Sequence, residues 1–418
     1  MFSERRKVDL VLISFWVLLV SAGLMAIYST THGPAAEFLP QSVRDNFMRQ
    51  LLWAGLSLVA LGAVLALPIR FFQTMAYPIY GLTLVLLVIT LAIGREVNGA
   101  KAWLYFGPVG LQTSELAKVG TVLAVARLLS SRQARVDTVR YALAAVGLIL
   151  LPAGIIILQN DTGTALIFLA LVPIMLFWSG LPMATVLLVI SPALAGYLTV
   201  VYWPAALAFA VLFTVGMYWR TREAYMGVLA GLFTGGAAAA ASFALAYVLK
   251  PYQLARVISF TNPESEAFRK TYGFHLVQSK AAIGSGGLWG KGFMQGTQTQ
   301  GAYVPEQSTD FIFSVIGEEF GFVGAGLVVL LFTLLLIRLI RLGSECRHPF
   351  GMLVAAGVAG VILIHVFINI GMTTGLLPVI GIPLPFLSYG GSALLTHTLM
   401  LAIVLDLHRR RDDFSIFV

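Results

Sequence analysis

The sequence predicts an all-α polytopic membrane protein with about twelve transmembrane helices. Hydrophobic residues make up 58% of its 418 residues, charged residues make up only 11%, and the mean hydropathy is +0.88. Soluble domains carry about 25% charged residues, so this chain buries much of its apolar surface in lipid. A hydrocarbon core about 30 Å thick is crossed by roughly 20 apolar residues in a helix, and this length defines the predicted spans.

Twelve apolar segments approach that length, and we expect them to form one integral membrane domain over 1–418. The segment 204–219 is the weakest of them, because it is short and begins at Pro204. The predicted spans are 9–28, 51–67, 75–93, 112–130, 140–158, 163–180, 183–201, 204–219, 225–249, 311–340, 352–370 and 389–407.

The basic residues between these spans predict the orientation. The short loops fall on two sides of the membrane, and those on one side carry few basic residues, namely Arg44, Arg49, Arg95 and Lys101. The richer side receives Arg5, Arg6, Lys7, Arg70, Arg132, Arg135, Arg140, Arg220, Arg222, Arg338, Arg341, Arg347, Arg409, Arg410 and Arg411. The positive-inside rule then places both termini in the cytoplasm and the long loop 250–310 outside. The net charge of +8 thus reflects topology and does not indicate a nucleic-acid partner.

The polar stretch 278–321 differs from the rest of the chain. Glycines, amides, two lysines and four carboxylates lie together there, directly before a long apolar segment. Polar backbone and ionisable groups at a membrane boundary are costly unless they bind or convert something polar. We therefore expect the chemistry in this loop. The single cysteine, Cys346, excludes an intramolecular disulfide, and the sequence has no His or Cys spacing typical of a metal site.

Asp310 is the most promising residue of this stretch. It is the last polar residue before the apolar segment FIFSVIG, which places it at the outer interface. One interpretation is a helix N-cap, with Ser308 and Thr309 as rival caps. The other is a functional carboxylate within reach of a lipid head group. The preceding glycine-rich segment 283–292 is either a phosphate cradle built from backbone amides or simply a flexible re-entrant loop.

Asp161 is the only charged residue between Arg140 and Arg220. It lies at the junction of two spans, so it is either an N-cap for the second span or a functional intramembrane carboxylate. The two roles are compatible. Both alternatives stay open at this point.

Glu115 and Lys118 stand three residues apart near the outer end of the fourth span, on one face of a helix. A partly buried ion pair is the favoured interpretation, and a lysine that binds phosphate is the alternative. Glu318 and Glu319 are interpreted as interior polar contacts. His365 and His397 are interpreted as packing residues without clustered partners.

Six sequence blocks resemble the SEDS family of peptidoglycan polymerases (shape, elongation, division and sporulation), and the last block is similar to the elongation branch. They are spread over most of the chain in the family's order, and the last three are highly specific. The blocks are NGAKAW with GLQTSELAK (98–118), QNDTGTAL (159–166), KPYQLARVISFTNPES (250–265), QSKAAIGSGGLWGKGF (278–293), VPEQSTDFIFSVIGEEFG (304–321) and NIGMTTGLLPVIGIPLPFLSYGGSAL (369–394).

The resemblance implies a glycosyltransferase that polymerises lipid II at the outer face of the bacterial cytoplasmic membrane, together with a class B penicillin-binding protein. The family's essential aspartate corresponds to Asp310, which would act as general base on the 4-hydroxyl of the acceptor sugar. Positive charge on the diphosphate leaving group would come from a divalent cation such as Mg²⁺ or Mn²⁺ or from lysines. The substrate-binding candidates are Glu115, Lys118, Asp161, Lys280, Lys291 and Glu306.

The chain departs from the family pattern in two ways. Ala102 and Thr113 stand where the family has an arginine and a proline, and Lys101 is the candidate replacement for the missing positive charge. The family also has ten spans, so the region 181–249 is interpreted as carrying an inserted helix pair. Two other functions remain possible on the residues alone: a lipid II flippase and a non-catalytic scaffold for a penicillin-binding protein.

Overall fold

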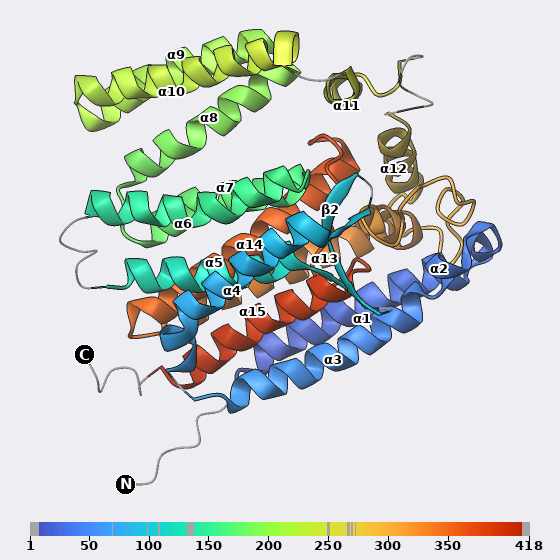
Figure 1. Cartoon of the computed structure of the whole chain (residues 1–418). Helices are drawn as coiled ribbons and strands as arrows, with labels where there is room; N and C mark the ends of the chain where they lie inside the picture. The colour runs from blue at the N-terminus through green and yellow to red at the C-terminus, as the bar shows by residue number, and fades with distance from the viewer. Residues whose placement is uncertain are drawn as a thin grey trace. The chain divides into compact units, whose positions relative to one another are not determined.

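The structure is a computed structural model that describes residues 8–411, apart from positions 69, 98, 108, 132–137, 249–250, 266–267, 269–270 and 272. Its described part is mainly helical, as the sequence predicts, with one small antiparallel sheet (Figure 1). Five basic residues used for the orientation lie outside the described residues, namely Arg5, Arg6, Lys7, Arg132 and Arg135.

The chain forms two compact units. Unit 1 comprises Met1–Met175 and Gln278–Val418, and unit 2 comprises Leu176–Val277. The helices of unit 1 are α1 (Leu10–His32), η1 (Pro34–Phe38), α2 (Gln41–Arg44), α3 (Asn46–Ala66), α4 (Phe71–Ile93), α5 (Thr113–Leu129), α6 (Thr138–Leu158), α13 (Ile312–Ser344), α14 (Pro349–Thr374) and α15 (Gly391–Arg409). Two helices cross a unit boundary, α7 (Thr162–Trp178) and α12 (Phe274–Ser285).

Each of the twelve predicted spans falls on a helix. Nine helical segments in the described part of the chain are long and apolar enough to cross a membrane, and three predicted spans fall on helices outside that set, α5, α7 and α9 (Trp203–Thr221). The weakest prediction, 204–219, is thus a helix. This protein is a multi-pass membrane protein, and the number of helices that cross the bilayer stays a prediction.

Helices α14 and α15 form the core of unit 1, because they are buried over most of their length. Small residues on α14 permit this close packing. A Cβ at Gly357 would lie 2.7 Å from a methyl carbon of Val122, and one at Gly360 would lie 2.9 Å from a methyl carbon of Ile174. Helices α1, α3, α4 and α6 instead leave large apolar side chains exposed, as expected for helices that face lipid.

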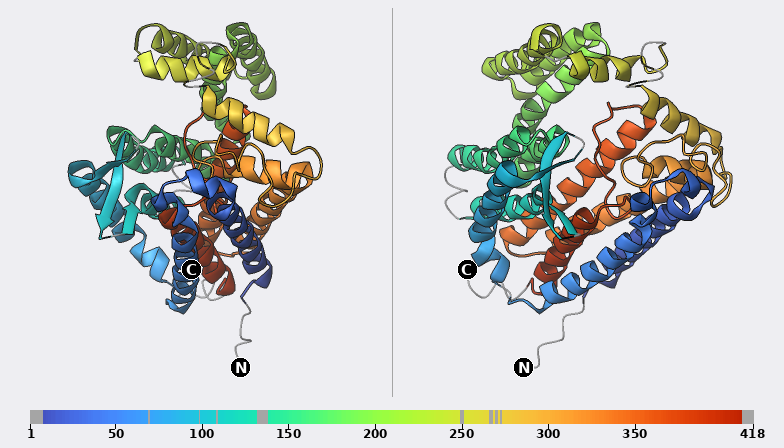
Figure 2. Two further views of the ribbon diagram at one scale, coloured as in Figure 1. Left: turned by 90° about the vertical axis from the view of Figure 1, so that its right-hand side faces the viewer. Right: turned by 45° about the vertical axis from the view of Figure 1, so that its right-hand side comes forward.

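A three-stranded antiparallel sheet lies between α4 and α5 in the sequence, and its second strand contacts both helices (Figure 2). Its strands are β1 (Arg95–Val97), β2 (Ala100–Phe106) and β3 (Val109–Gln112), and Trp103 pairs with Gln112. Burial alternates along β2, where Ala102 and Leu104 point inward, as expected for a strand with one covered face. The sequence predicted only a short loop between two spans here, so the sheet is a finding of the structure.

Unit 2 consists of α8 (Met183–Val201), α9, α10 (Ala224–Phe243), the π-helical turn η3 (Ala244–Val248) and α11 (Pro251–Thr261). Helices α8, α9 and α10 pack against one another around a small apolar core formed by Leu188, Met217, Met226 and Ala230. The region 181–249, interpreted above as carrying an inserted helix pair, lies in this unit. The loop 250–310 contains two helices that were not predicted from the sequence, α11 and α12.

Candidate active site

Helix α13 is broken at Gly321, and the glycine-rich loop 286–292 pairs with the broken ends. Gly321 has φ 65° and ψ −161°, so two hydrogen bonds of the regular helical ladder are not made. The amides of Phe322 and Val323 and the carbonyls of Glu318 and Glu319, which would pair with each other in a regular helix, bond to the loop instead. These four bonds run from Phe322 N to Gly287 O (2.9 Å), Val323 N to Leu288 O (3.1 Å), Lys291 N to Glu318 O (3.0 Å) and Gly292 N to Glu319 O (3.0 Å).

The glycines of this loop permit close contact between two backbones. A Cβ at Gly286 would lie 2.0 Å from the carbonyl oxygen of Gly317, and one at Gly290 would lie 2.1 Å from that of Glu319. The amides of Lys291 and Gly292 already donate to carbonyls of α13. The suggested phosphate cradle is therefore wrong for these two amides. The backbone of the loop is hydrogen-bonded to both sides of the helix break.

Glu318 organises the polar side of the loop. Its buried carboxylate accepts hydrogen bonds from the Lys291 ammonium (2.7 Å), from the amides of Gln298 (2.9 Å) and Thr299 (2.8 Å) and from the Thr299 hydroxyl (2.7 Å). The interpretation of Glu318 as an interior polar contact is confirmed. Lys291 also donates to two neighbouring hydroxyls, so its ammonium is held within the protein.

Glu319 points to the other side of α13. Its carboxylate accepts hydrogen bonds from the Ser29 hydroxyl on α1 and from the side-chain amide of Gln300. Glu319 is buried, so it too is an interior polar contact, as expected from the sequence. The two adjacent glutamates thus tie the 291–300 segment and α1 to the same turn of α13.

Asp310 is half-buried directly before α13, and its carboxylate is not a helix cap. The N-cap position of α13 is Phe311, and no side chain makes a capping bond there. The N-cap interpretation of Asp310, and of its rivals Ser308 and Thr309, is therefore wrong. No hydrogen bond from the described residues reaches the carboxylate. Its Oδ2 atom faces Gly381, where a Cβ would lie only 3.1 Å away.

The environment of Asp310 favours its protonated form. Removal from water raises the pKa of Asp310 from 3.8 to about 7, and the negative charge of Glu306 adds to the effect. Glu306 is exposed, has φ 48°, and accepts a hydrogen bond from the Thr309 hydroxyl at 3.0 Å. A carboxylate whose pKa lies near neutral pH, without a cation beside it, is what a general base requires.

Asp161 caps α7, which confirms one of its two possible roles. Its Oδ1 accepts from the Thr164 amide at 3.0 Å, and its Oδ2 accepts from the Thr164 hydroxyl at 2.8 Å. The Oδ2 atom also accepts from the Gln112 side-chain amide at 3.1 Å, which connects α7 to the end of the sheet. A further function for Asp161 stays a prediction.

Glu115 and Lys118 form the predicted ion pair, fully buried in unit 1, with 2.7 Å between Oε1 and Nζ. The Lys118 ammonium also lies 2.8 Å from Nε2 of His365, and the His365 and His397 rings meet edge to face at 4.8 Å. Both histidines are buried, as the packing interpretation expects, but the expectation that they lack clustered partners is wrong. They lie far apart in the sequence, so only the packing of α14 on α15 brings them together.

The remaining candidates lie at the surface or in the sheet. Lys280 is exposed on α12. Lys101, considered as a replacement for the missing arginine, donates to the carbonyl of Ala92 at 2.9 Å. Thr113 pairs its hydroxyl with that of Thr90 at 2.9 Å. The structure thus brings Asp310 to Glu306 and Lys118 to Glu115, and it pairs Lys291 with Glu318.

Comparison with known proteins decides the family. The family model described as cell cycle protein, for FtsW, RodA and SpoVE, matches residues 9–206 and 199–413. The chain belongs to the FtsW/RodA/SpoVE family. The peptidoglycan glycosyltransferase RodA of Treponema pallidum is 33% identical over 96% of this chain and 98% of its own. The peptidoglycan glycosyltransferase MrdB of Escherichia coli is 33% identical over 88% of this chain and 86% of its own.

Similar solved structures support this family assignment. A chain of a peptidoglycan synthase complex that coordinates polymerization and crosslinking superposes with a TM-score of 0.70 at 30% identity, covering 97% of this chain and 98% of that one. The crystal structure of RodA from Thermus thermophilus gives a TM-score of 0.63 at 30% identity, with 97% of each chain covered. The expected membership of the SEDS family is therefore confirmed, and the relatives named RodA and MrdB agree with the expected similarity to its elongation branch.

The residues around Asp310 fit a divalent cation only in part. Within the described ranges, no group of three or more His, Cys, Asp or Glu side chains is arranged to hold a metal. Mg²⁺ is commonly held by one or two carboxylates together with substrate phosphate oxygens. Asp310 and Glu306 supply two carboxylates, so a cation would need the substrate's diphosphate for its other oxygens. When bound, it would neutralise charge on the leaving group.

Proposed function

We propose that this protein is a peptidoglycan glycosyltransferase that polymerises lipid II into glycan strands, with Asp310 as its general base. The curated relatives at 33% identity are named peptidoglycan glycosyltransferases, which supports the enzyme class. The observation that carries the proposed role is the half-buried carboxylate of Asp310, which the described residues leave without a cation or a hydrogen-bond donor. Its pKa is raised to about 7 by removal from water.

The chemistry follows from that carboxylate. The acceptor sugar's 4-hydroxyl loses its proton to Asp310 as its oxygen attacks the anomeric carbon of the donor. The bond from that carbon to the undecaprenyl diphosphate breaks, and the diphosphate leaves with the electron pair. Direct displacement of this kind inverts the configuration at the anomeric carbon. Lys280 and Lys291 are the lysines of this loop that stay candidates for contact with the diphosphate.

The membrane geometry and a partner complete the proposal. The positive-inside pattern supports an enzyme of the bacterial cytoplasmic membrane with cytoplasmic termini, so that loop 250–310 and Asp310 face outward. A class B penicillin-binding protein would crosslink the strands as they form. The similarity to a chain of a peptidoglycan synthase complex supports this partnership. A role in cell elongation follows from the relatives named RodA and MrdB.

The test is lipid II polymerisation by the purified protein with its cognate class B penicillin-binding protein. Wild type and Asp310→Asn are compared, each with added Mg²⁺ or Mn²⁺ and with a chelator. We expect glycan chains from wild type and none from a folded Asp310→Asn. Loss of product on chelation would add a divalent cation to the mechanism, while equal product with the chelator would exclude that requirement.

Two outcomes would redirect the proposal. Equal product from both proteins would remove Asp310 as the general base. No product from wild type, with translocation of labelled lipid II across liposomes, would instead identify a flippase. A scaffold would give neither activity yet still co-purify with the penicillin-binding protein.

A further inference from the structure

Three successive carbonyls ending at Asp310 accept hydrogen bonds from one neighbouring region, the end of α14 and the segment 376–390 that follows it. We call these three bonds the carbonyl clamp. They run from Tyr389 N to Ser308 O (2.8 Å), from Ser388 Oγ to Thr309 O (2.5 Å) and from Asn369 Nδ2 to Asp310 O (2.9 Å). The backbone at Ser308, Thr309 and Asp310 is thus held by three hydrogen bonds.

Asn369 links two parts of the site. Its Nδ2 also donates to the carbonyl of Ile382 at 2.7 Å, so one amide group spans the segment 376–390 and Asp310. Asn369 is fully buried, and its Oδ1 has no partner among the described residues. The opposite placement of the amide would set oxygen against two carbonyl oxygens, so the bonding pattern itself fixes its orientation.

Ser388 is the second side chain of the carbonyl clamp. Its hydroxyl donates to Thr309 and accepts from the Leu384 amide at 2.8 Å. Its own carbonyl accepts from the Gln50 side chain at 3.2 Å. Ser388 is buried, so these bonds form away from bulk water, where losing one partner leaves an unsatisfied group.

The segment 376–390 is itself held in an unusual conformation. Phe386 is buried with φ 65°, which is rare for a bulky residue and persists only where the surroundings enforce it. A Cβ at Gly23 of α1 would lie 2.5 Å from the Phe386 carbonyl oxygen, so α1 packs directly against this turn. The same segment places Gly381 against Oδ2 of Asp310.

The buried Glu115–Lys118 ion pair is linked to the segment 376–390 through His365. His365 lies one helical turn before Asn369 on α14, and its Nδ1 lies 3.2 Å from the carbonyl of Pro383, while its Nε2 faces Lys118. His365 and Asn369 therefore hold the successive carbonyls of Pro383 and Ile382. The Glu115–Lys118 pair and Asp310 are in this way connected through one segment.

We propose that Asn369 and Ser388 are positioning residues, which hold the Asp310 carboxylate against Gly381 for proton removal from the acceptor. This inference rests on the proposed function, and it adds two residues that act through the backbone at Thr309 and Asp310. Catalytic groups need placement within a fraction of an ångström, and misplacement by about 1 Å can lower a rate by about 100-fold. The carbonyl clamp provides such placement, because it acts on the backbone of Asp310 itself.

The test is Ser388→Ala, which removes one hydroxyl, assayed with the cognate penicillin-binding protein against wild type. Ser344→Ala is the matched control. Among the described residues, the Ser344 hydroxyl bonds to the Arg341 carbonyl of its own helix, at the opposite end of α13. We expect Ser388→Ala to lower kcat about tenfold with little change in KM. We also expect the acid limb of its pH–rate profile to move to lower pH, because a loosened carboxylate is better hydrated.

Rescue makes the test specific. Ser388→Thr keeps the hydroxyl and is expected to recover most of the rate, whereas Asn369→Leu, which loses two bonds, is expected to be worse than Ser388→Ala. A folded Ser388→Ala with wild-type kcat and an unmoved acid limb would overturn the inference. So would a loss of rate explained by the lower amount of folded protein alone. Asp310→Asn in the same assay separates this failure from failure of the proposed function, because only the latter leaves that variant active.

Discussion

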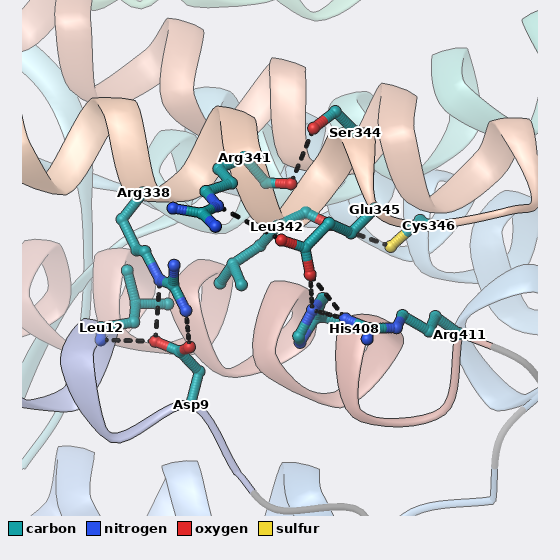
Figure 3. Close-up of polar contacts among 10 residues, drawn as sticks. All are labelled: Asp9, Leu12, Arg338, Arg341, Leu342, Ser344, Glu345, Cys346, His408 and Arg411. Carbon is teal, nitrogen blue, oxygen red and sulfur yellow. Dashed lines mark hydrogen bonds and ion pairs between the residues drawn. The ribbon is translucent and has the colours of Figure 1, made fainter.

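The two ends of α13 hold carboxylates in opposite electrostatic situations. At the end where α13 meets α1 and α15, Asp9 pairs with Arg338, and Glu345 contacts His408 and Arg411 (Figure 3). At the other end, Asp310 faces a glycine, and among the described residues Glu306 is the charged neighbour that acts on it. One helix therefore carries a neutralised end and an end with an unneutralised carboxylate.

The pKa values show what this difference means. Burial by itself would raise the pKa of Asp9, but bonds from Arg338 and the Leu12 amide outweigh it and lower that pKa. The hydrogen bond with His408 lowers the pKa of Glu345. At Asp310, burial acts without such compensation and raises the pKa to about 7. Paired carboxylates stabilise the fold, whereas an unpaired one is placed for chemistry at an energetic cost.

The largest predicted effect comes from neutralising each end in turn. Asp310→Asn is expected to lower the polymerisation rate by about 10²–10⁴-fold, the usual contribution of a general base. Asp9→Asn is expected to keep the rate and lose about 1–3 kcal/mol of stability, because it removes a charged bond to Arg338. Rates with lipid II and unfolding in detergent measure the two quantities. Similar losses of rate in both variants would remove the contrast.

The pH dependence of stability tests whether the pKa of Asp310 is raised. The folded-state pKa of Asp310 is raised from 3.8 to about 7, so the protonated carboxyl adds stability fully below 3.8, and this is lost as pH rises through about 7. Asp310→Asn is therefore expected to lose less stability than wild type between pH 4 and pH 7, within the window set by those two values. An identical pH dependence in melting experiments would argue against a raised pKa.

The next effect concerns the buried ion pair. Lys118→Met leaves Glu115 as an uncompensated buried charge, which is expected to cost about 3–5 kcal/mol. The double variant Glu115→Gln with Lys118→Met is expected to recover part of that stability, because no charge is then left. Chemical denaturation in detergent micelles measures both. A single variant as stable as wild type would contradict the buried placement of the pair.

A smaller effect distinguishes two glycines of the loop 286–292. Gly287 and Gly290 both have positive φ, so alanine at either position is expected to cost about 1 kcal/mol in backbone strain. Only at Gly290 does the added Cβ meet the backbone of Glu319, while the space around Gly287 is open. Gly290→Ala is therefore expected to destabilise more and to lower the rate. Equal melting temperatures would show that the loop is not packed into the helix break.

The smallest effect is expected at the surface of the neutralised end. Glu345→Gln breaks partly exposed contacts with Arg411 and His408 and is expected to lose no more than about 1 kcal/mol, less at high salt. Because the folded-state pKa of Glu345 is lowered from 4.5, this contribution is present above that value and is lost as pH falls below it. Stability curves from pH 3 to pH 7 test this. A rate change in this variant would mean that the end matters for catalysis.

The helices were predictable because each apolar segment has the length of a bilayer span. All twelve predicted spans fall on helices, and the spacing of Glu115 and Lys118 predicted their ion pair correctly. The break at Gly321 was not predicted, since an isolated glycine inside a predicted span does not by itself indicate a break. The sheet at 95–112 was missed because its strands are short and adjoin the predicted spans.

The site was predictable only as far as local chemistry extends. Asp310 was identified from its place before an apolar segment and from resemblance. That its carboxylate does not cap α13 was shown only by the structure, which places the N-cap at Phe311. Asn369 and Ser388 lie within a block that carries the family resemblance, so a signal existed. Their bonds to the Asp310 region depend on a turn between α14 and α15 that no local pattern encodes.

The most direct test of the central claim, that Asp310 is a general base with a raised pKa, is the pH–rate profile of lipid II polymerisation. Initial rates are measured from about pH 4 to pH 9 with saturating lipid II and the cognate penicillin-binding protein, and circular dichroism confirms that the protein stays folded. We expect an acid limb with its midpoint near 7, since only the ionised carboxylate accepts the proton. A limb near 4, the range of an ordinary hydrated aspartate, would contradict it.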